Sequence, residues 1–428
     1  MKVRNENLYV VMKAYVSAAL EYVTKHAKEA QSASGGDDLD FYWVMARYSC
    51  DLIKLPEYEA CLSELRNDEE ISRHLDQNVG SYSRGALTPN AESMMKHVLD
   101  LGRLNGSYDF HPDRFDREYS IFEDTYYSEA LRCEAIAPLQ GLLLEIPVVD
   151  LSSDVEITQL EEEEMKPYRA RGSHWDNRWC AVRVKYQLPK VIGDKDSEDR
   201  FPKIQKERAI EEVANERIEE VVNALRLMGK CDVYHSGIIH QTPKWLSIQH
   251  HSVASRVLGT GFITYSFAHG EAQSLKALWN RLEVPIVKKE LDVAVRRFGD
   301  SCVRHRHEDK LIDLMIASES LFLRGTKEGE KSFRLALRAG QFLGEGGSAK
   351  QVYDRMRLAY YCRSVLVHGG RPSADRKLKK IDLGELVAGV GDDIQAAIFK
   401  AMNLLGSPEI DGNLDDGYWE RYLFSAQS

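Results

Sequence analysis

The stretch Arg363-Ser364-Val365-Leu366-Val367-His368-Gly369-Gly370 is the part of this 428-residue sequence that decides how its fold is interpreted. It holds an arginine and a histidine with four residues between them, a spacing written R-x4-H. An arginine side chain can bind a phosphate through several N–H groups, and a histidine can exchange a proton near neutral pH. Because such a pair is common by chance, its meaning depends on the sequence around it.

The residues before this pair predict a helix, since apolar side chains recur at helical spacing and no Pro or Gly interrupts them before Gly369. Arg363 is therefore expected in the last turns of the helix and His368 at its end. On an ideal helix these two side chains are about 140° apart. They share a site only if the arginine reaches around, the helix end unwinds or a second subunit contributes. The apolar positions are Leu358, Tyr361, Cys362 and Val365.

Four other segments near this helix have helical periodicity. Together they predict a helix, an acidic helix, a third helix, the R-x4-H helix and a final helix. The final segment contains Gly389 and Gly391, which are expected to interrupt it. The four segments are 286–297, 309–323, 331–343 and 381–405.

This order of helices, with the residues that accompany it, resembles the HEPN superfamily and most closely its Apea-like branch. The resemblance covers about 285–405 and predicts a HEPN-like helical bundle there. The matching residues are Arg304, Glu308 to Leu314, Ser318 to Phe322, and Tyr360 to Gly369.

The resemblance implies a helical domain that pairs with a copy of itself. In active members, the R-x4-6-H residues of two subunits form one metal-independent ribonuclease site. The 2′-hydroxyl of RNA would attack the adjacent phosphate and leave a 2′,3′-cyclic phosphate. By this resemblance Arg363 stabilises charge on the phosphorane, and His368 acts as general acid or base. Neither a metal nor a cofactor is expected.

Two side chains near the pair bear on whether such a site would be active. The residue after the arginine is often Asn, Asp or His in active members, and here it is Ser364. This departure favours a non-catalytic module for RNA or nucleotide binding or for dimerisation, whereas the presence of both Arg363 and His368 favours the ribonuclease. Glu319 interrupts an apolar helix and is expected either to orient Arg363 or to face water. A sensor that binds a ligand phosphate through Arg363 is a third alternative.

The charge distribution supports a phosphate ligand for this region. The whole chain has a formal net charge of −10. Residues 285–405 contain 22 Lys and Arg and 16 Asp and Glu, a net charge of +6, and the remainder carries −16. A phosphate-binding domain needs such local positive potential. A run of cations directly after the motif is expected either to bind nucleic acid or to form a solvated loop. Its members are Arg371, Arg376, Lys377, Lys379 and Lys380.

The rest of the chain predicts a mainly α protein with an α+β middle region. Residues 1–142 are expected to be helical, 143–270 to be mixed, and 406–428 to be an acidic tail. In the middle region, Ala181 to Tyr186 and Thr260 to Phe267 alternate as half-buried strands do. A charged helix is expected between them, from Ile204 to Leu227.

Composition narrows the class of protein and its expected location. The seven cysteines include no C-x-x-C pair, so reduced thiols in a cytoplasm are expected rather than a zinc ribbon or a disulfide framework. No apolar run approaches the length of a membrane span. His305-Arg306-His307 lacks a third metal ligand and is expected to be an exposed helix start or part of a basic edge facing RNA. A homodimeric toxin or antiviral effector, with a trigger or regulatory partner at 1–270, is the overall hypothesis.

Overall fold

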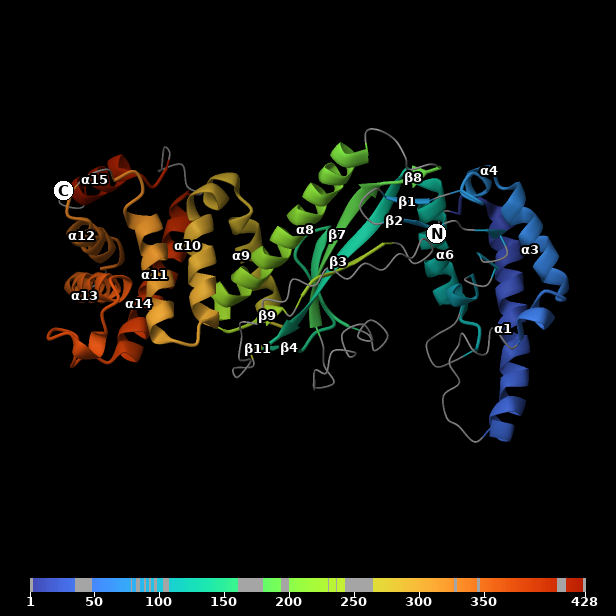
Figure 1. Cartoon of the computed structure of the whole chain (residues 1–428), viewed down its shortest axis with the longest axis horizontal. Coiled ribbons are helices and arrows are strands. Elements are labelled where there is room, and N and C mark those ends of the chain that lie inside the picture. Colours follow the sequence, from blue (N-terminus) through green and yellow to red (C-terminus); the bar gives the residue numbers. More distant parts are fainter. Residues whose placement is uncertain are drawn as a thin grey trace. The chain divides into compact units, whose positions relative to one another are not determined.

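The computed structural model (Figure 1) has a mainly helical chain with a smaller, largely antiparallel sheet, which confirms the predicted mainly α class with some β structure. Residues 161–179 and 243–264 lie outside the described residues. So does most of the strand expected from Thr260. The structure describes residues 3–34, 48–77, 79–81, 85–87, 90–91, 94–95, 98–102, 108–160, 180–193, 200–229, 231–235, 237–242, 265–326, 329–344, 347–405 and 413–425.

Two compact units make up the chain, and both are discontinuous in sequence. The first unit comprises residues 1–136, 185–214 and 239–252, and the second comprises 137–184, 215–238 and 253–428. Three elements begin in one unit and end in the other. These elements are strand β3 (Ala130–Gln140), strand β7 (Cys180–Pro189) and helix α8 (Arg200–Gly229).

The first unit is built around the amphipathic helix α1. Leu8, Tyr15 and Ala19 on α1 are buried in a core that also receives an aromatic ladder from α6. A short antiparallel sheet in the order β2-β1-β8 accompanies the helices. The elements are α1 (Glu6–Ser34), α3 (Pro56–Asn67), α4 (Glu69–Ser72), β1 (Val79–Ser81), β2 (Gly85–Leu87), η1 (Val98–Leu101), α6 (Pro112–Tyr127) and β8 (Val191–Ile192).

The larger sheet has the strand order β10-β3-β7-β6-β5, with β9 also paired to β3. The alternating stretch from Ala181 forms β7, and the strand predicted there is confirmed. Its neighbour β6 pairs antiparallel with both β5 and β7. A separate parallel pair joins β4 to β11. The remaining bounds are β4 (Leu142–Leu144), β5 (Val148–Asp150), β6 (Val155–Gln159), β9 (Tyr234–His235), β10 (Ile239–Gln241) and β11 (Tyr265–Phe267).

A helical bundle forms the C-terminal part of the second unit (Figure 1), and the predicted order of helices is found there. Gly389 and Gly391 do not interrupt α14, contrary to expectation. A Cβ at Gly389 would lie 2.9 Å from Cδ of Arg355, so this glycine makes room for the arginine. The helices are α9 (Glu271–Leu282), α10 (Pro285–Val303), α11 (His307–Phe322), α12 (Lys331–Leu343), α13 (Ala349–Val367), η4 (Pro372–Ala374), α14 (Leu383–Leu405) and α15 (Asp416–Ser425).

Helix α15 lies in the stretch expected to be an acidic tail, yet it packs into the bundle. Trp419 is 1% exposed, contacts the rings of Phe322 and Phe342, and donates its indole N–H to the carbonyl of Leu321 at 3.1 Å. Acidic composition concealed this helix, because one apolar residue per turn supplies its buried contact.

Buried charges in the bundle are paired across helices. Asp313 of α11 is 3% exposed and accepts hydrogen bonds from Arg297 at 3.0 Å and Arg304 at 2.7 Å. Asp393 of α14 accepts two from Arg355 of α13, at 2.7 and 2.9 Å. Because an unpaired buried charge is costly, each pair restricts which faces of two helices can meet.

Replacing Asp393 by alanine should destabilise the bundle by about 3 kcal/mol, since Arg355 would remain partly buried without its acceptor. The double change Arg355→Met with Asp393→Leu should recover most of that loss, because it removes both charges. Urea unfolding followed by circular dichroism measures both. Equal unfolding midpoints for the single variant and the wild type would contradict this account of the pair.

His74 in the first unit should make stability depend on pH. It is 1% exposed, and burial together with the charge of Lys190 lowers the pKa of its ring to about 4. The unfolded chain, with an ordinary histidine pKa of about 6.5, binds the extra proton between these two values. Stability should therefore fall by about 3 kcal/mol as pH drops from 6.5 to 4.

The variant His74→Gln isolates this contribution from that of the carboxylates. Urea midpoints of the first unit at pH 7 and pH 4.5 should differ less in the variant than in the wild type. The same pH difference in both proteins would assign acid sensitivity to other groups.

Candidate functional site

Helix α13 carries the R-x4-H pair and owes its position to a narrow buried stripe. Val352, Met356, Ala359 and Cys362 are spaced three or four residues apart and are at most 4% exposed. Such spacing places them on one face, which packs against the rest of the bundle. Arg363 directly follows the last of these residues, so its side chain leaves the helix at the edge of the buried face.

The end of α13 is a Schellman turn, which confirms the predicted helix end at His368. The N–H of Gly369 donates to the carbonyl of Leu366 at 3.0 Å, and the N–H of Gly370 donates to that of Val365 at 2.9 Å. Gly369 has φ of +77°, in the left-handed region that favours glycine. His368 is the C-cap residue and is exposed, so its imidazole is free to meet a ligand from solution.

Arg363 extends toward α11, where it meets Glu319. Its Nη2 lies 3.8 Å from Oε2 of Glu319, beyond hydrogen-bond range, and the two side chains are 26% and 29% exposed. Within the described part of the chain, Nε of Arg363 is buried and has no hydrogen-bond partner. This nitrogen therefore retains a donor that no group in the described residues satisfies.

Tyr360 joins these two residues, and sequence reasoning assigned it no role. It lies three residues before Arg363, which on a helix places the two side chains on neighbouring positions. Burial raises the pKa of the Tyr360 hydroxyl, and the nearby Glu319 carboxylate raises it further. In the sequence, the three-residue spacing between Tyr360 and Arg363 could have indicated that their side chains are neighbours.

The expected site residues lie in different surroundings. Arg363 packs toward α11, whereas His368 is exposed at the end of α13. Ser364 lies between them and contributes its backbone carbonyl, which accepts the N–H of His368 at 3.2 Å. The position of Ser364 thus supports the helix end.

The basic run after α13 has a defined backbone conformation. Asp375 accepts hydrogen bonds from the N–H groups of Lys377 and Leu378, at 2.8 and 3.1 Å, and from the hydroxyl of Tyr361 at 3.0 Å. These bonds hold the pKa of Asp375 below its ordinary value. Leu378 is 2% exposed and anchors the loop. The exposed cations are Arg371, Arg376, Lys377, Lys379 and Lys380.

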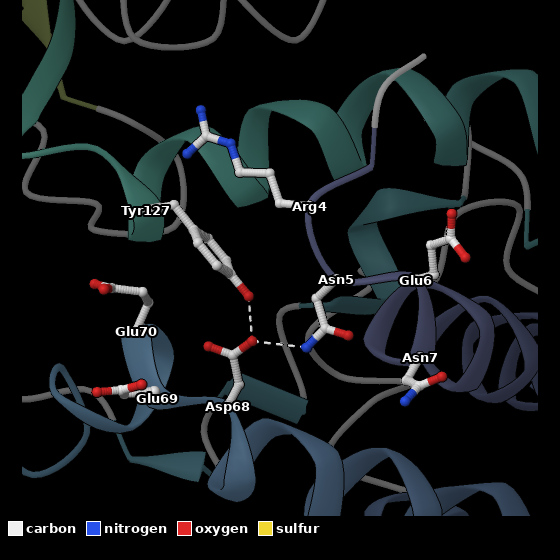
Figure 2. A pocket seen from close by; sticks show the side chains of 8 residues that line it. All are labelled: Arg4, Asn5, Glu6, Asn7, Asp68, Glu69, Glu70 and Tyr127. Atoms are coloured by element: carbon white, nitrogen blue, oxygen red, sulfur yellow. Dashed lines mark hydrogen bonds between the residues drawn. The ribbon is translucent and has the colours of Figure 1, made fainter.

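A pocket in the first unit, shown in Figure 2, is a second candidate location. Its wall is largely acidic, but the buried acid at its base is committed to the fold. Asp68 caps α4, because its Oδ1 accepts a hydrogen bond from the N–H of Ile71 at 2.9 Å. Its Oδ2 accepts hydrogen bonds from the side-chain amide of Asn5 at 2.7 Å and from the hydroxyl of Tyr127. This carboxylate therefore ties α1, α4 and α6 together.

The described residues contain no group of three or more His, Cys, Asp and Glu side chains placed to hold a metal ion. None of the described helices has both the length and the apolar content needed to span a bilayer. No protein-family model, curated protein or solved structure matches this chain.

Replacing Gly369 by alanine should lower the stability of the bundle by about 1 kcal/mol, because an L residue is strained at positive φ. Gly391→Ala is the matched control: it lies inside α14, where a Cβ would meet only Leu314 at 3.9 Å. That control should be stabilising by about 0.5 kcal/mol. Urea unfolding compares both, and two effects of the same sign would contradict the assigned turn.

Proposed function

We propose that the helical bundle is a metal-independent endoribonuclease of HEPN type that acts as a homodimer. The observation that carries this proposal is the buried Nε of Arg363, a charged donor without an acceptor, on the helix that ends at exposed His368. Leaving a buried donor unsatisfied costs about 1–3 kcal/mol. A ligand oxygen that orders this guanidinium would offset part of that cost.

Arg363 would stabilise negative charge on the phosphorane. Its guanidinium is planar, always charged and able to make paired hydrogen bonds to phosphate oxygens. Glu319 lies too far from it for a tight pair, so it orients the guanidinium without neutralising it by direct hydrogen bonding. Donors already held in place need little reorganisation as charge develops in the transition state.

His368 would carry the proton transfers. As a base, it accepts the proton of the 2′-hydroxyl while that oxygen attacks the phosphorus atom. The bond from phosphorus to the 5′-oxygen breaks, and the leaving oxygen takes a proton from a His368 side chain that acts as the general acid. The products are a 2′,3′-cyclic phosphate and a 5′-hydroxyl. An imidazole suits both steps because its ordinary pKa lies near neutral pH.

A second copy of the chain would complete the site, since Arg363 and His368 of one chain face different ways. Apolar side chains close to the motif support such pairing. Val367 is 54% exposed and immediately precedes His368, and Ile381 at the end of the basic loop is 37% exposed. Exposed apolar residues beside functional groups are typical of interaction surfaces.

A non-catalytic RNA-binding or dimerisation module is the second candidate. Ser364 favours it, because an active site of this type often has Asn, Asp or His at that position. The basic loop serves this candidate equally well, since phosphate contacts supply affinity without chemistry.

The deciding measurement is cleavage of end-labelled total RNA in EDTA. Wild type should cleave and leave cyclic-phosphate ends, and Arg363→Ala and His368→Ala should each lose about 100-fold or more in rate. Arg357→Ala removes another arginine of α13 that is exposed and should cleave normally. RNA binding by folded wild type without cleavage would support the second candidate. Cleavage that is unchanged in both variants would contradict the roles proposed for Arg363 and His368.

A further inference from the structure

The start of α14, which follows the basic loop, lies next to the start of α11 at one end of the bundle. A Cβ built on Gly384, at the start of α14, would lie 3.5 Å from Cε1 and Nε2 of His307, at the start of α11. The basic loop 371–380 leads directly into α14. Both connections, from α10 to α11 and from α13 to α14, lie at the lower end of the bundle in Figure 1.

A third element reaches the same place. The pKa of the Cys362 thiol on α13 is raised to about 11, first by burial and then by the charges of Glu308 and Asp375. Glu308 belongs to the first turn of α11, and Asp375 organises the basic loop. The end of α13 lies beside the basic loop, where the hydroxyl of Tyr361 donates to Asp375 at 3.0 Å.

Cations at this end point to solvent, while two of the acids are used by the fold. His305, Arg306 and His307 are exposed, as are the cations of the loop. Asp375 accepts three hydrogen bonds within the loop and from Tyr361. Asp382 caps α14 by accepting N–H groups of Gly384 and Glu385, at 2.8 and 3.1 Å.

The remaining acids reduce the positive charge here without cancelling it. Glu308, Asp309 and Glu385 lie in the first turns of α11 and α14, where negative charge also stabilises the helix. Arg304 is not available to a ligand in the same way, because it donates to Asp313 at 2.7 Å.

We infer that the start of α11 and the basic loop form one phosphate-binding surface, here called the bundle-end surface, which holds a nucleic-acid backbone leading to His368. The inference rests on the proposed ribonuclease function for one point, which is that the bound nucleic acid is RNA. The surface comprises His305, Arg306, His307, Arg371, Arg376, Lys377, Lys379 and Lys380.

The composition of the surface favours nucleic acid over an acidic protein. Protein interfaces take most of their affinity from buried aromatic and apolar anchors. Of the described large apolar residues of the loop, Leu378 is buried in the bundle and only Ile381 is markedly exposed. A row of separate cations instead suits a regular polyanion, in which each neutralised phosphate releases counterions.

The inference predicts that both segments contribute to binding through salt-dependent contacts. Each phosphate contact to a single strand adds about 0.7 to the slope of log K against log salt, which corresponds to roughly fivefold in affinity at 0.1 M salt. Removing two lysines of the loop should therefore weaken binding by about 25-fold and lower that slope by about 1.4, and removing Arg306 from the start of α11 should weaken it by about fivefold and lower the slope by about 0.7.

The test is fluorescence anisotropy with a 20-nucleotide RNA whose 2′-hydroxyls are methylated, so that no cleavage occurs, titrated over 50–300 mM NaCl. The α11 variant is His305→Ser with Arg306→Ser, and the loop variant is Lys379→Ser with Lys380→Ser. Lys206→Ser with Arg208→Ser is the matched control, because it removes two exposed cations from α8. Circular dichroism checks that each variant is folded.

Weaker binding and a lower slope in both test variants, with the control unchanged, is the expected result. Normal binding by the α11 variant, or no binding by wild type at 20 µM, overturns the inference. Tighter binding of poly-glutamate than of the RNA assigns the surface to an acidic protein and also overturns it. Binding that depends on both segments without any RNA cleavage by wild type would uphold this surface while the proposed nuclease fails.

Discussion

Burying a charge without a partner is costly, and in the described bundle the most buried carboxylates are each paired with an arginine. Apolar stripes on the helices of such a bundle tolerate small shifts, but a buried carboxylate accepts only the placement that brings its arginine into range. These pairs join six helices two by two: α10 with α11, α12 with α15, and α13 with α14. The pairs are Asp313 with Arg297 and Arg304, Glu290 with Arg324, Arg338 with Asp416, and Asp393 with Arg355.

Arg363 and Glu319 differ from these structural pairs in the way a functional site should. Their separation of 3.8 Å is longer than the 2.7 to 3.0 Å of the hydrogen bonds at Asp313 and Asp393, and the Glu319 side chain is 29% exposed, against 4% for Asp313 and 10% for Asp393. A tight buried pair would resist exchange of its partner. A loose and partly solvated pair can accept a phosphate oxygen at small cost. The surrounding bundle can therefore be rigid while the guanidinium of Arg363 stays available to a ligand.

Local rules in the sequence predicted the helices well, including the end of α13, because Gly369-Gly370 encodes a Schellman turn. The failures came from contacts between distant residues. Gly389 suggested a break in α14, yet it accommodates Arg355 from another helix. The acidic sequence around Trp419 did not indicate that this side chain is buried against residues of other helices. For the candidate site, sequence supplied Arg363 and His368, whereas the adjacency of His307 to Gly384 depends on how three helix ends meet.

The interleaving of the two units has a consequence for how the chain acquires its structure during synthesis. Multidomain chains generally fold from the N-terminus as each domain emerges. Here the first unit draws on residues up to 252, and strand β3 waits for β10, about a hundred residues later in the chain. Neither unit is complete until that segment has been made. The N-terminal helices therefore spend part of translation with an unfinished core, when chaperones have their clearest opportunity to bind.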